Sequence, residues 1–197
     1  MFANRFTAFV DACALAGALK RNLLCTLAEA GFFRIRWSAQ VLDETERAIA
    51  DILSRKKVTD AARRASRARR ALEDAFEEAL VADYAALLCV GADTLPDPDD
   101  AHVLAAALKT QAAIIVTDNL KHFPPAQMAA LNMEVRSTDA FIADTIALDP
   151  GRAVAAIRRM RQRFRKPEIT QARLLLDMEA SGLTEVVDIL RSHIDSL

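Results

Sequence analysis

Polar side chains at three separate places in the sequence are best suited to chemistry, and most of them are acids. Asp11 ends the strand-like segment FTAFVD, and Asp118 and Asn119 follow a second one, AIIVT. Asp100 ends the acid-rich loop DTLPDPDD and begins the helix-like segment that precedes AIIVT. Ligands of a parallel sheet bind beyond the carboxyl ends of its strands, so these side chains are expected to meet at one sheet edge.

Carboxylates gathered in one cleft repel one another, and each raises the pKa of its neighbours. A bound divalent cation would remove that cost. The candidate ligand atoms are all oxygens, which is typical of Mg²⁺ or Mn²⁺ sites. No zinc-site spacing is present among the histidines and cysteines, which are His102, His122, His193, Cys13, Cys25 and Cys89.

Each of these residues also has an ordinary structural explanation. Asp100 could complement the dipole of the helix that it precedes. Asp97 and Asp99 lie beside prolines and are typical turn residues. Asp11 could cap the following helix, and Asn119 could belong to a plain turn. The combination indicates a site, whereas no single residue does.

The chain that must position these residues has 197 residues, a length typical of one domain with a helical appendage. Hydrophobic residues make up 52% and charged residues 27%, which indicates a globular chain. The 26 basic and 27 acidic residues nearly cancel, which excludes a histone-like polycation. Any nucleic-acid surface must therefore be a local patch.

Three features favour a cytoplasmic protein. The sequence has no apolar run of about eighteen residues, so no membrane span is expected. Asp11 interrupts the apolar N-terminal stretch, which argues against a secretory signal. The cysteines are odd in number and widely spaced, which fits reduced thiols.

Strand-like and helix-like segments alternate up to about residue 137, which predicts an α/β fold: a three-layer parallel sheet with helices on both faces. Strands are expected at 6–11, 32–37, 85–90, 113–117 and 133–136. Helices are expected at 12–30 before Gly31, from the N-cap Ser38 onward, and at 59–82, 100–110 and 124–131. Four further helices, at 139–148, 151–164, 168–180 and 184–196, predict a C-terminal all-helical appendage. We therefore expect two domains, residues 1–139 and 140–197.

Four motifs in this chain resemble the PIN-domain ribonucleases, in particular the branch of VapC-type toxins from bacterial toxin–antitoxin pairs. The motifs are FVDACAL (9–15), WSAQVLDETERAI (37–49), LPDPDDAHVLAAAL (95–108) and IIVTDNLKHFP (114–124). Their order and spacing agree with the family over about residues 6–137. One branch of the family carries helical extensions in the place of residues 140–197.

The resemblance implies a role for each matching residue. The catalytic positions of the family are occupied by Asp11, Glu44, Asp100 and Asn119. The metal ligands that it implies are Asp11, Asp100 and Glu44, and Asp118, the neighbour of Asn119, could supply a further carboxylate to the metal site. Many relatives have Asp where this chain has Asn119, so a second metal ion is expected to bind weakly there or not at all. Periodicity alone does not separate Glu44 from Glu46, and only the resemblance selects Glu44.

The activity that the resemblance implies is hydrolysis of RNA by a Mg²⁺- or Mn²⁺-dependent endoribonuclease. A metal ion can activate the attacking water and neutralise charge on the phosphate, so no protein nucleophile is needed. The family also implies a cognate antitoxin that covers the acidic site, and a homodimer.

An acidic site repels RNA, so binding must come from basic residues elsewhere. Residues 55–70 contain eight Lys or Arg and one Asp, and residues 152–166 contain seven and no acid. Either stretch could follow a phosphate backbone, and either could be a solvated helix face. In the second stretch we select Arg158, Arg159 and Arg161 as candidate RNA ligands.

Two functions of other classes remain open at this point. The neutral Asn119 favours a non-catalytic RNA-binding or regulatory PIN-like module. A strand-end Asp11 could also be the nucleophile of a phosphoryl-transfer enzyme. Phosphatases of that kind usually have a second Asp two residues later, where this chain has Cys13.

Overall fold

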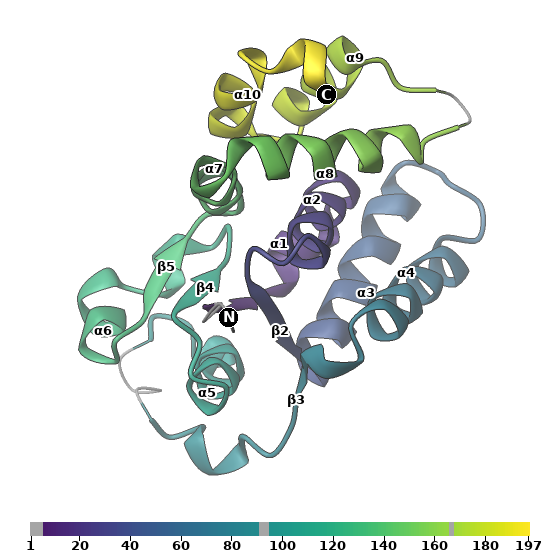
Figure 1. Ribbon diagram of the computed structural model, residues 1–197. Coiled ribbons are helices and arrows are strands. Elements are labelled where there is room, and N and C mark those ends of the chain that lie inside the picture. The colour runs from purple at the N-terminus through teal and green to yellow at the C-terminus, as the bar shows by residue number, and fades with distance from the viewer. Residues whose placement is uncertain (1–5, 91–94, 166–167) are drawn as a thin grey trace. The chain divides into compact units, whose positions relative to one another are not determined.

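The computed structural model describes residues 6–90, 95–165 and 168–197 (Figure 1). These residues form two compact units. The first unit consists of the N-terminal residues up to Ala16 together with Arg34–Arg136, and the second of Gly17–Phe33 together with Ser137–Leu197. Within the described ranges, no helix is long and apolar enough to cross a membrane.

The first unit contains a five-stranded parallel sheet in the order β3-β2-β1-β4-β5. Its strands are β1 (Thr7–Val10), β2 (Arg34–Ser38), β3 (Leu80–Val81), β4 (Ile114–Val116) and β5 (Glu134–Arg136). The central strand β1 is buried at Ala8, Phe9 and Val10. Val10 is in register with Val116, so the residues that follow β1 and β4 share one sheet edge.

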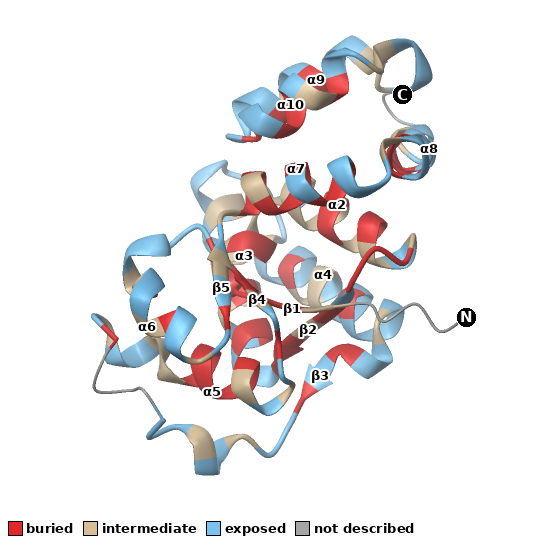
Figure 2. Cartoon of the chain, turned by 60° about the vertical axis from the view of Figure 1, so that its left-hand side comes forward, coloured by how far each residue is buried: buried red, intermediate tan, exposed pale blue. Residues whose placement is uncertain are grey.

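Helices cover both faces of this sheet, which confirms the predicted α/β architecture. They are α1 (Ala12–Ala16), α3 (Ala39–Arg55), α4 (Ala61–Ala75), α5 (Ala101–Lys109) and α6 (Pro125–Ala130). Figure 1 shows α5 on one side of β2 and α3 with α4 on the other. Helix α5 packs against β1 and β2, and it is buried without a break from His102 to Ala107 (Figure 2).

Short 3₁₀ turns set the ends of several elements. They are η1 (Glu77–Ala79), η2 (Ala85–Leu87), η4 (Pro98–Asp100) and η5 (Leu120–His122). Turn η4 leads directly into α5, and η5 follows β4, so both lie next to the residues expected in the site. The predicted N-cap is also confirmed, because the Ser38 hydroxyl accepts a 3.2 Å hydrogen bond from the backbone N–H of Val41.

Several expected elements differ in the structure. The strand expected at 85–90 is wrong: this segment begins with the 3₁₀ turn η2, and most of it is exposed. The edge strand that pairs with β2 is β3 instead, with Leu80 opposite Trp37. The helix expected at 59–82 ends at Ala75. Residues 93 and 94 of the expected acidic loop lie outside the described residues.

Among the residues described for the second unit, the regular elements are helices, which confirms the predicted helical C-terminal region. Its helices are α2 (Ala18–Glu29), α7 (Thr138–Leu148), α8 (Pro150–Gln162), α9 (Gln171–Ala180), α10 (Thr184–Arg191) and the 3₁₀ turn η6 (Ile194–Ser196). The single helix expected at 12–30 is two helices that separate at Gly17, and only the second belongs to this unit. The boundary at 139/140 stays a prediction.

A buried carboxylate joins two helices of the second unit. Asp139 on α7 accepts hydrogen bonds from Thr184 Oγ1 (3.2 Å) and from the backbone N–H groups of Glu185 (2.9 Å) and Val186 (3.1 Å). These N–H groups belong to the first turn of α10 and have no partner within that helix. Asp139 therefore supplies the N-terminal cap that α10 lacks in its own sequence, where Leu183 is the N-cap residue.

Candidate active site

Asp11 stands directly after β1 and is 5% exposed. Its Oδ1 accepts a 2.6 Å hydrogen bond from the backbone N–H of Ala12. Its Oδ2 accepts one from Thr117 Oγ1 at 2.7 Å and one from Cys13 Sγ at 3.1 Å. Because donors from both strand ends hold the carboxylate, its position is set by the pairing of β1 with β4.

The same two donors also fix the turn after β4. Thr117 Oγ1 accepts a 3.1 Å hydrogen bond from the backbone N–H of Asn119, and Cys13 Sγ accepts one of 3.1 Å from that of Asp118. Burial, followed by the charge of Asp11, raises the pKa of Cys13 to about 12. The thiol therefore stays protonated and acts as a hydrogen-bond donor. The predicted residues Asp118 and Asn119 are both exposed beside Asp11.

Asp100 lies at the end of η4, at the start of α5. Burial raises the pKa of its carboxyl, and the charges of Asp11 and Asp97 raise it further, although the hydrogen bond with His122 opposes them. Two of the predicted site acids, Asp11 and Asp100, are therefore close enough to repel each other. This is the repulsion that the sequence predicts for acids gathered at one sheet edge.

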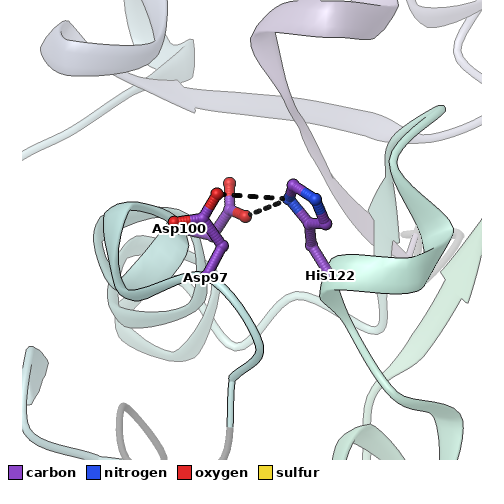
Figure 3. A group of neighbouring side chains, drawn as sticks. All are labelled: Asp97, Asp100 and His122. Atoms are coloured by element: carbon purple, nitrogen blue, oxygen red, sulfur yellow. Dashed lines mark hydrogen bonds and ion pairs between the residues drawn. The ribbon is translucent and has the colours of Figure 1, made fainter.

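Figure 3 shows two further residues at Asp100. The Nδ1 atom of His122 lies 2.7 Å from Oδ2 of Asp100 and 3.7 Å from Oδ2 of Asp97. Ligand atoms of these three side chains all lie within 4.8 Å of one another, a spacing that suits one metal ion. The sequence favours a turn role for Asp97, and it does not assign His122 to the site.

Glu44 lies on α3 and is tied to α5 by a histidine. Its Oε1 lies 3.1 Å from Nε2 of the buried His102 and accepts a 3.4 Å hydrogen bond from Gln40. Burial raises the pKa of Glu44, but the hydrogen bond and charge of His102, together with Gln40 and Arg47, lower it, and the net result is a pKa below its ordinary value. Glu44 is thereby held as a carboxylate next to α5, the helix that begins directly after Asp100.

The neighbouring acids of α3 have a different partner. Asp43 and Glu46 both form ion pairs with Arg69 on α4, the latter at 3.2 Å. Periodicity could not separate Glu46 from Glu44, but the structure directs Glu46 to α4 and Glu44 to α5. Arg69 also pairs with Glu73 at 3.1 Å, so this arginine of the basic stretch 55–70 is engaged in holding α3 to α4.

The predicted RNA ligands lie in the second unit, on α8. Arg158 and Arg159 are exposed. Arg161 differs from them, because its guanidinium already donates a 2.6 Å hydrogen bond to the backbone carbonyl of Ile169. On α4 of the first unit, Arg64, Arg67 and Arg70 are also exposed.

Comparison with known proteins finds a matching family model for each of two parts of the chain. A family model described as PIN domain matches residues 7–121, and one described as VapC50 C-terminal domain matches residues 138–192. The "Putative ribonuclease VapC50" of Mycobacterium tuberculosis (strain ATCC 25618 / H37Rv) is 37% identical over 76 residues. This alignment covers 39% of the present chain and 45% of the relative, less than half the length of either. No solved structure matches the chain.

Proposed function

The chain belongs to the PIN-domain family, and from this premise we propose that it is a metal-dependent endoribonuclease, the toxin of a type II toxin–antitoxin pair. The observation that carries the proposal is that Asp11, after β1, lies near enough to Asp100, at the start of α5, for the two carboxylates to repel each other. Repulsion between carboxylates costs stability in the unliganded protein. Such a cost is expected where an acidic pair serves to bind a cation.

The residues present fit a divalent cation. Asp11, Asp97 and Asp100 supply carboxylate oxygens, and the pKa of Asp100 is raised first by burial and then by the negative charges of Asp11 and Asp97. We propose that Asp11 and Asp100 hold Mg²⁺ or Mn²⁺, with Glu44 beside them and Asp118 at a weaker second position. When bound, the cation lowers the pKa of water and neutralises charge on the scissile phosphate.

The remaining site residues would orient the reactants. Thr117 and Cys13 hold the carboxylate of Asp11 in one rotamer by donating to the same oxygen. Asn119 is exposed beside it and carries an amide that can accept from a water and donate to a phosphate oxygen. Because Asn119 has no charge, it would contribute less than an aspartate to holding a second cation.

The substrate and partners proposed for the chain follow from its family. The substrate would be RNA, held through exposed arginines such as Arg158 and Arg159, since the acidic site itself repels phosphates. The partner would be a cognate antitoxin that covers the acids with a basic side chain. We also propose that the toxin is a homodimer, because dimers are common in the family.

Incubation of the purified protein with total RNA tests the activity. Cleavage is expected with Mg²⁺ or Mn²⁺, and EDTA or the Asp100→Asn substitution should abolish it. Binding of RNA without cleavage under any metal would instead support a non-catalytic RNA-binding module, the function that the neutral Asn119 favours. A protein that neither binds nor cleaves RNA would overturn both.

A further inference from the structure

Three metal-ligating side chains from two turns converge beside the start of α5. Asp97 is the N-cap residue of η4, Asp100 is the last residue of that turn, and His122 is the last residue of η5. The two turns are separated in sequence by α5 and β4. In Figure 3 the imidazole ring points with Nδ1 toward both carboxylates.

Each of the three side chains offers a ligand atom within 4.8 Å of the other two. Nδ1 of His122 and Oδ2 of Asp100 are hydrogen-bonded to each other, so a bound cation would replace the proton between them. Asp97 uses Oδ1 to accept a 3.0 Å hydrogen bond from the backbone N–H of Asp99, which leaves Oδ2 directed to His122. The side chains of Asp97, Asp100 and His122 are 41%, 17% and 21% exposed. The group is therefore preorganised by the turns but open enough for an ion to enter from solvent.

The distances agree with inner-sphere coordination. Two ligands bound at about 2.1 Å from one ion lie about 3 Å apart when adjacent and about 4.2 Å apart when opposite. The separations from Nδ1 to the two carboxylate oxygens are 2.7 and 3.7 Å. Only a small adjustment is needed to place one cation between all three atoms. The position also includes Asp100, the residue at which the proposed nuclease needs its cation.

We propose that His122 is an inner-sphere ligand, through Nδ1, of the cation bound by Asp100 and Asp97, and that this nitrogen donor makes the site select Mn²⁺ over Mg²⁺. Mg²⁺ prefers oxygen ligands and gives up its water ligands reluctantly, whereas the divalent ions of the first transition row, of which Mn²⁺ is the weakest binder, gain affinity from a nitrogen ligand. The inference rests on the proposed function, because the selected ion is the one that would serve RNA cleavage. It adds a nitrogen donor to a site for which the sequence predicts oxygen ligands alone.

Pulsed electron paramagnetic resonance of the full-length protein loaded with Mn²⁺ tests the coordination directly. Imidazole bound to Mn²⁺ couples its ¹⁴N nucleus to the electron spin. This coupling is expected in the wild-type protein and in His193→Ala, which removes a histidine of the second unit, and should be lost in His122→Ala. A missing coupling in the wild type, or an unchanged coupling in His122→Ala, would overturn the inference.

Titration calorimetry with each ion separates a ligand from a residue that only orients Asp100. Loss of an orienting residue weakens metal binding by about 10–100-fold, but it should weaken both ions alike. The inference predicts that His122→Ala loses more than about tenfold in Mn²⁺ affinity and much less in Mg²⁺ affinity. Asp97→Asn should weaken both ions, because it removes an oxygen ligand. Equal losses for both ions in His122→Ala would show an orienting role.

Circular dichroism melting of each variant in EDTA checks that the fold is retained. The same samples incubated with RNA distinguish this inference from the proposed function. Cleavage without ¹⁴N coupling would overturn the metal-ligand role of His122 and would still support the proposed nuclease activity. Coupling without cleavage under any metal would leave the metal site standing and overturn the nuclease.

Discussion

Thr117 Oγ1 donates a 2.7 Å hydrogen bond to Oδ2 of Asp11, across 106 residues of sequence. The bond joins the ends of β1 and β4, two strands that are neighbours in the sheet. Thr117 is fully buried, and the same hydroxyl accepts the backbone N–H of Asn119. One side chain therefore sets the rotamer of the first site acid and the course of the turn that carries Asn119.

Replacing Thr117 by Val should impair both the site and the fold. The variant removes one of the three donors to the buried Asp11 carboxylate and takes the acceptor away from the backbone N–H of Asn119, so we expect a loss of about 1–3 kcal/mol in unfolding free energy. RNA cleavage should fall at saturating metal. Urea denaturation and cleavage rates measure the two effects. Thr117→Ser keeps the hydroxyl and is the matched control, and a Val variant as active as the Ser variant would contradict the role assigned to this bond.

The two central acids should respond differently to neutralisation. Asp100→Asn removes one of the charges that repel Asp11 and Asp97, so the metal-free protein should be as stable as the wild type or slightly more stable. Three groups donate hydrogen bonds to the two carboxylate oxygens of Asp11. Asp11→Asn replaces one of these oxygens by an NH₂ group that cannot accept, so it should lower the unfolding free energy by about 1–3 kcal/mol. Both should abolish cleavage. Thermal melts in EDTA that show the reverse order would contradict the geometry described for Asp11.

Asp139→Ala should destabilise the second unit by about 1–3 kcal/mol, because two N–H groups of α10 and the Thr184 hydroxyl lose their acceptor. Amide hydrogen exchange should quicken first at Glu185 and Val186. Asp188→Ala, at a 75% exposed side chain of the same helix, is the control and should change stability by less than about 0.5 kcal/mol. Equal effects of the two substitutions would exclude a capping role for Asp139.

The cysteines should differ in their reaction with iodoacetamide. Burial raises the pKa of Cys25 to about 12, so at pH 8 almost none of this thiol is the reactive thiolate. Cys13 is hydrogen-bonded and Cys89 is exposed. Mass spectrometry of the native protein should therefore find one label, at Cys89, and guanidinium should allow three. Rapid native labelling of Cys25 would contradict the raised pKa of its thiol, and Cys89→Ser should take up no label in the native state.

The salt dependence of RNA binding should identify the basic face. If α8 binds phosphates, replacing Arg158 and Arg159 by Ala should flatten the log–log slope by about 0.7 for each phosphate of single-stranded RNA that is no longer neutralised. Arg64, Arg67 and Arg70 on α4 provide the comparison variant. Filter binding with the Asp100→Asn background avoids cleavage. A slope that changes only in the α4 variant would move the binding face there.

Much of the fold could be predicted from local patterns. The apolar run before Asp11, the hydroxyl of Ser38 and the break at Gly31 each depend on a few adjacent residues, and each is where the sequence predicts it. The segment 85–90 shows where local pattern fails. Its apolar residues resemble a strand, but a strand also needs an open sheet edge, and β3 occupies the edge beside β2.

The histidine partners of the site could not be predicted in the same way. His102 meets Glu44 and His122 meets Asp100 only because α3, α5 and η5 fold around one sheet. The hydrophobic periodicity of a sequence indicates local helices and strands, and it carries no information on contacts between segments that are distant in the chain. A signal was nevertheless present, because His102 lies two residues after Asp100 and His122 three after Asn119. Histidines so close to predicted site residues are worth testing as ligands or partners.

The segment that connects β1 to β2 contributes to both compact units. It begins with α1 in the sheet unit and continues through α2, whose buried Leu23, Leu24 and Leu27 belong to the helical unit. The helical unit is therefore assembled from two stretches of chain, one of which is inserted between neighbouring strands. Recombination at a single junction near residue 137 would separate these stretches and leave α2 without its companions. The two units must consequently be inherited together, although each has its own core.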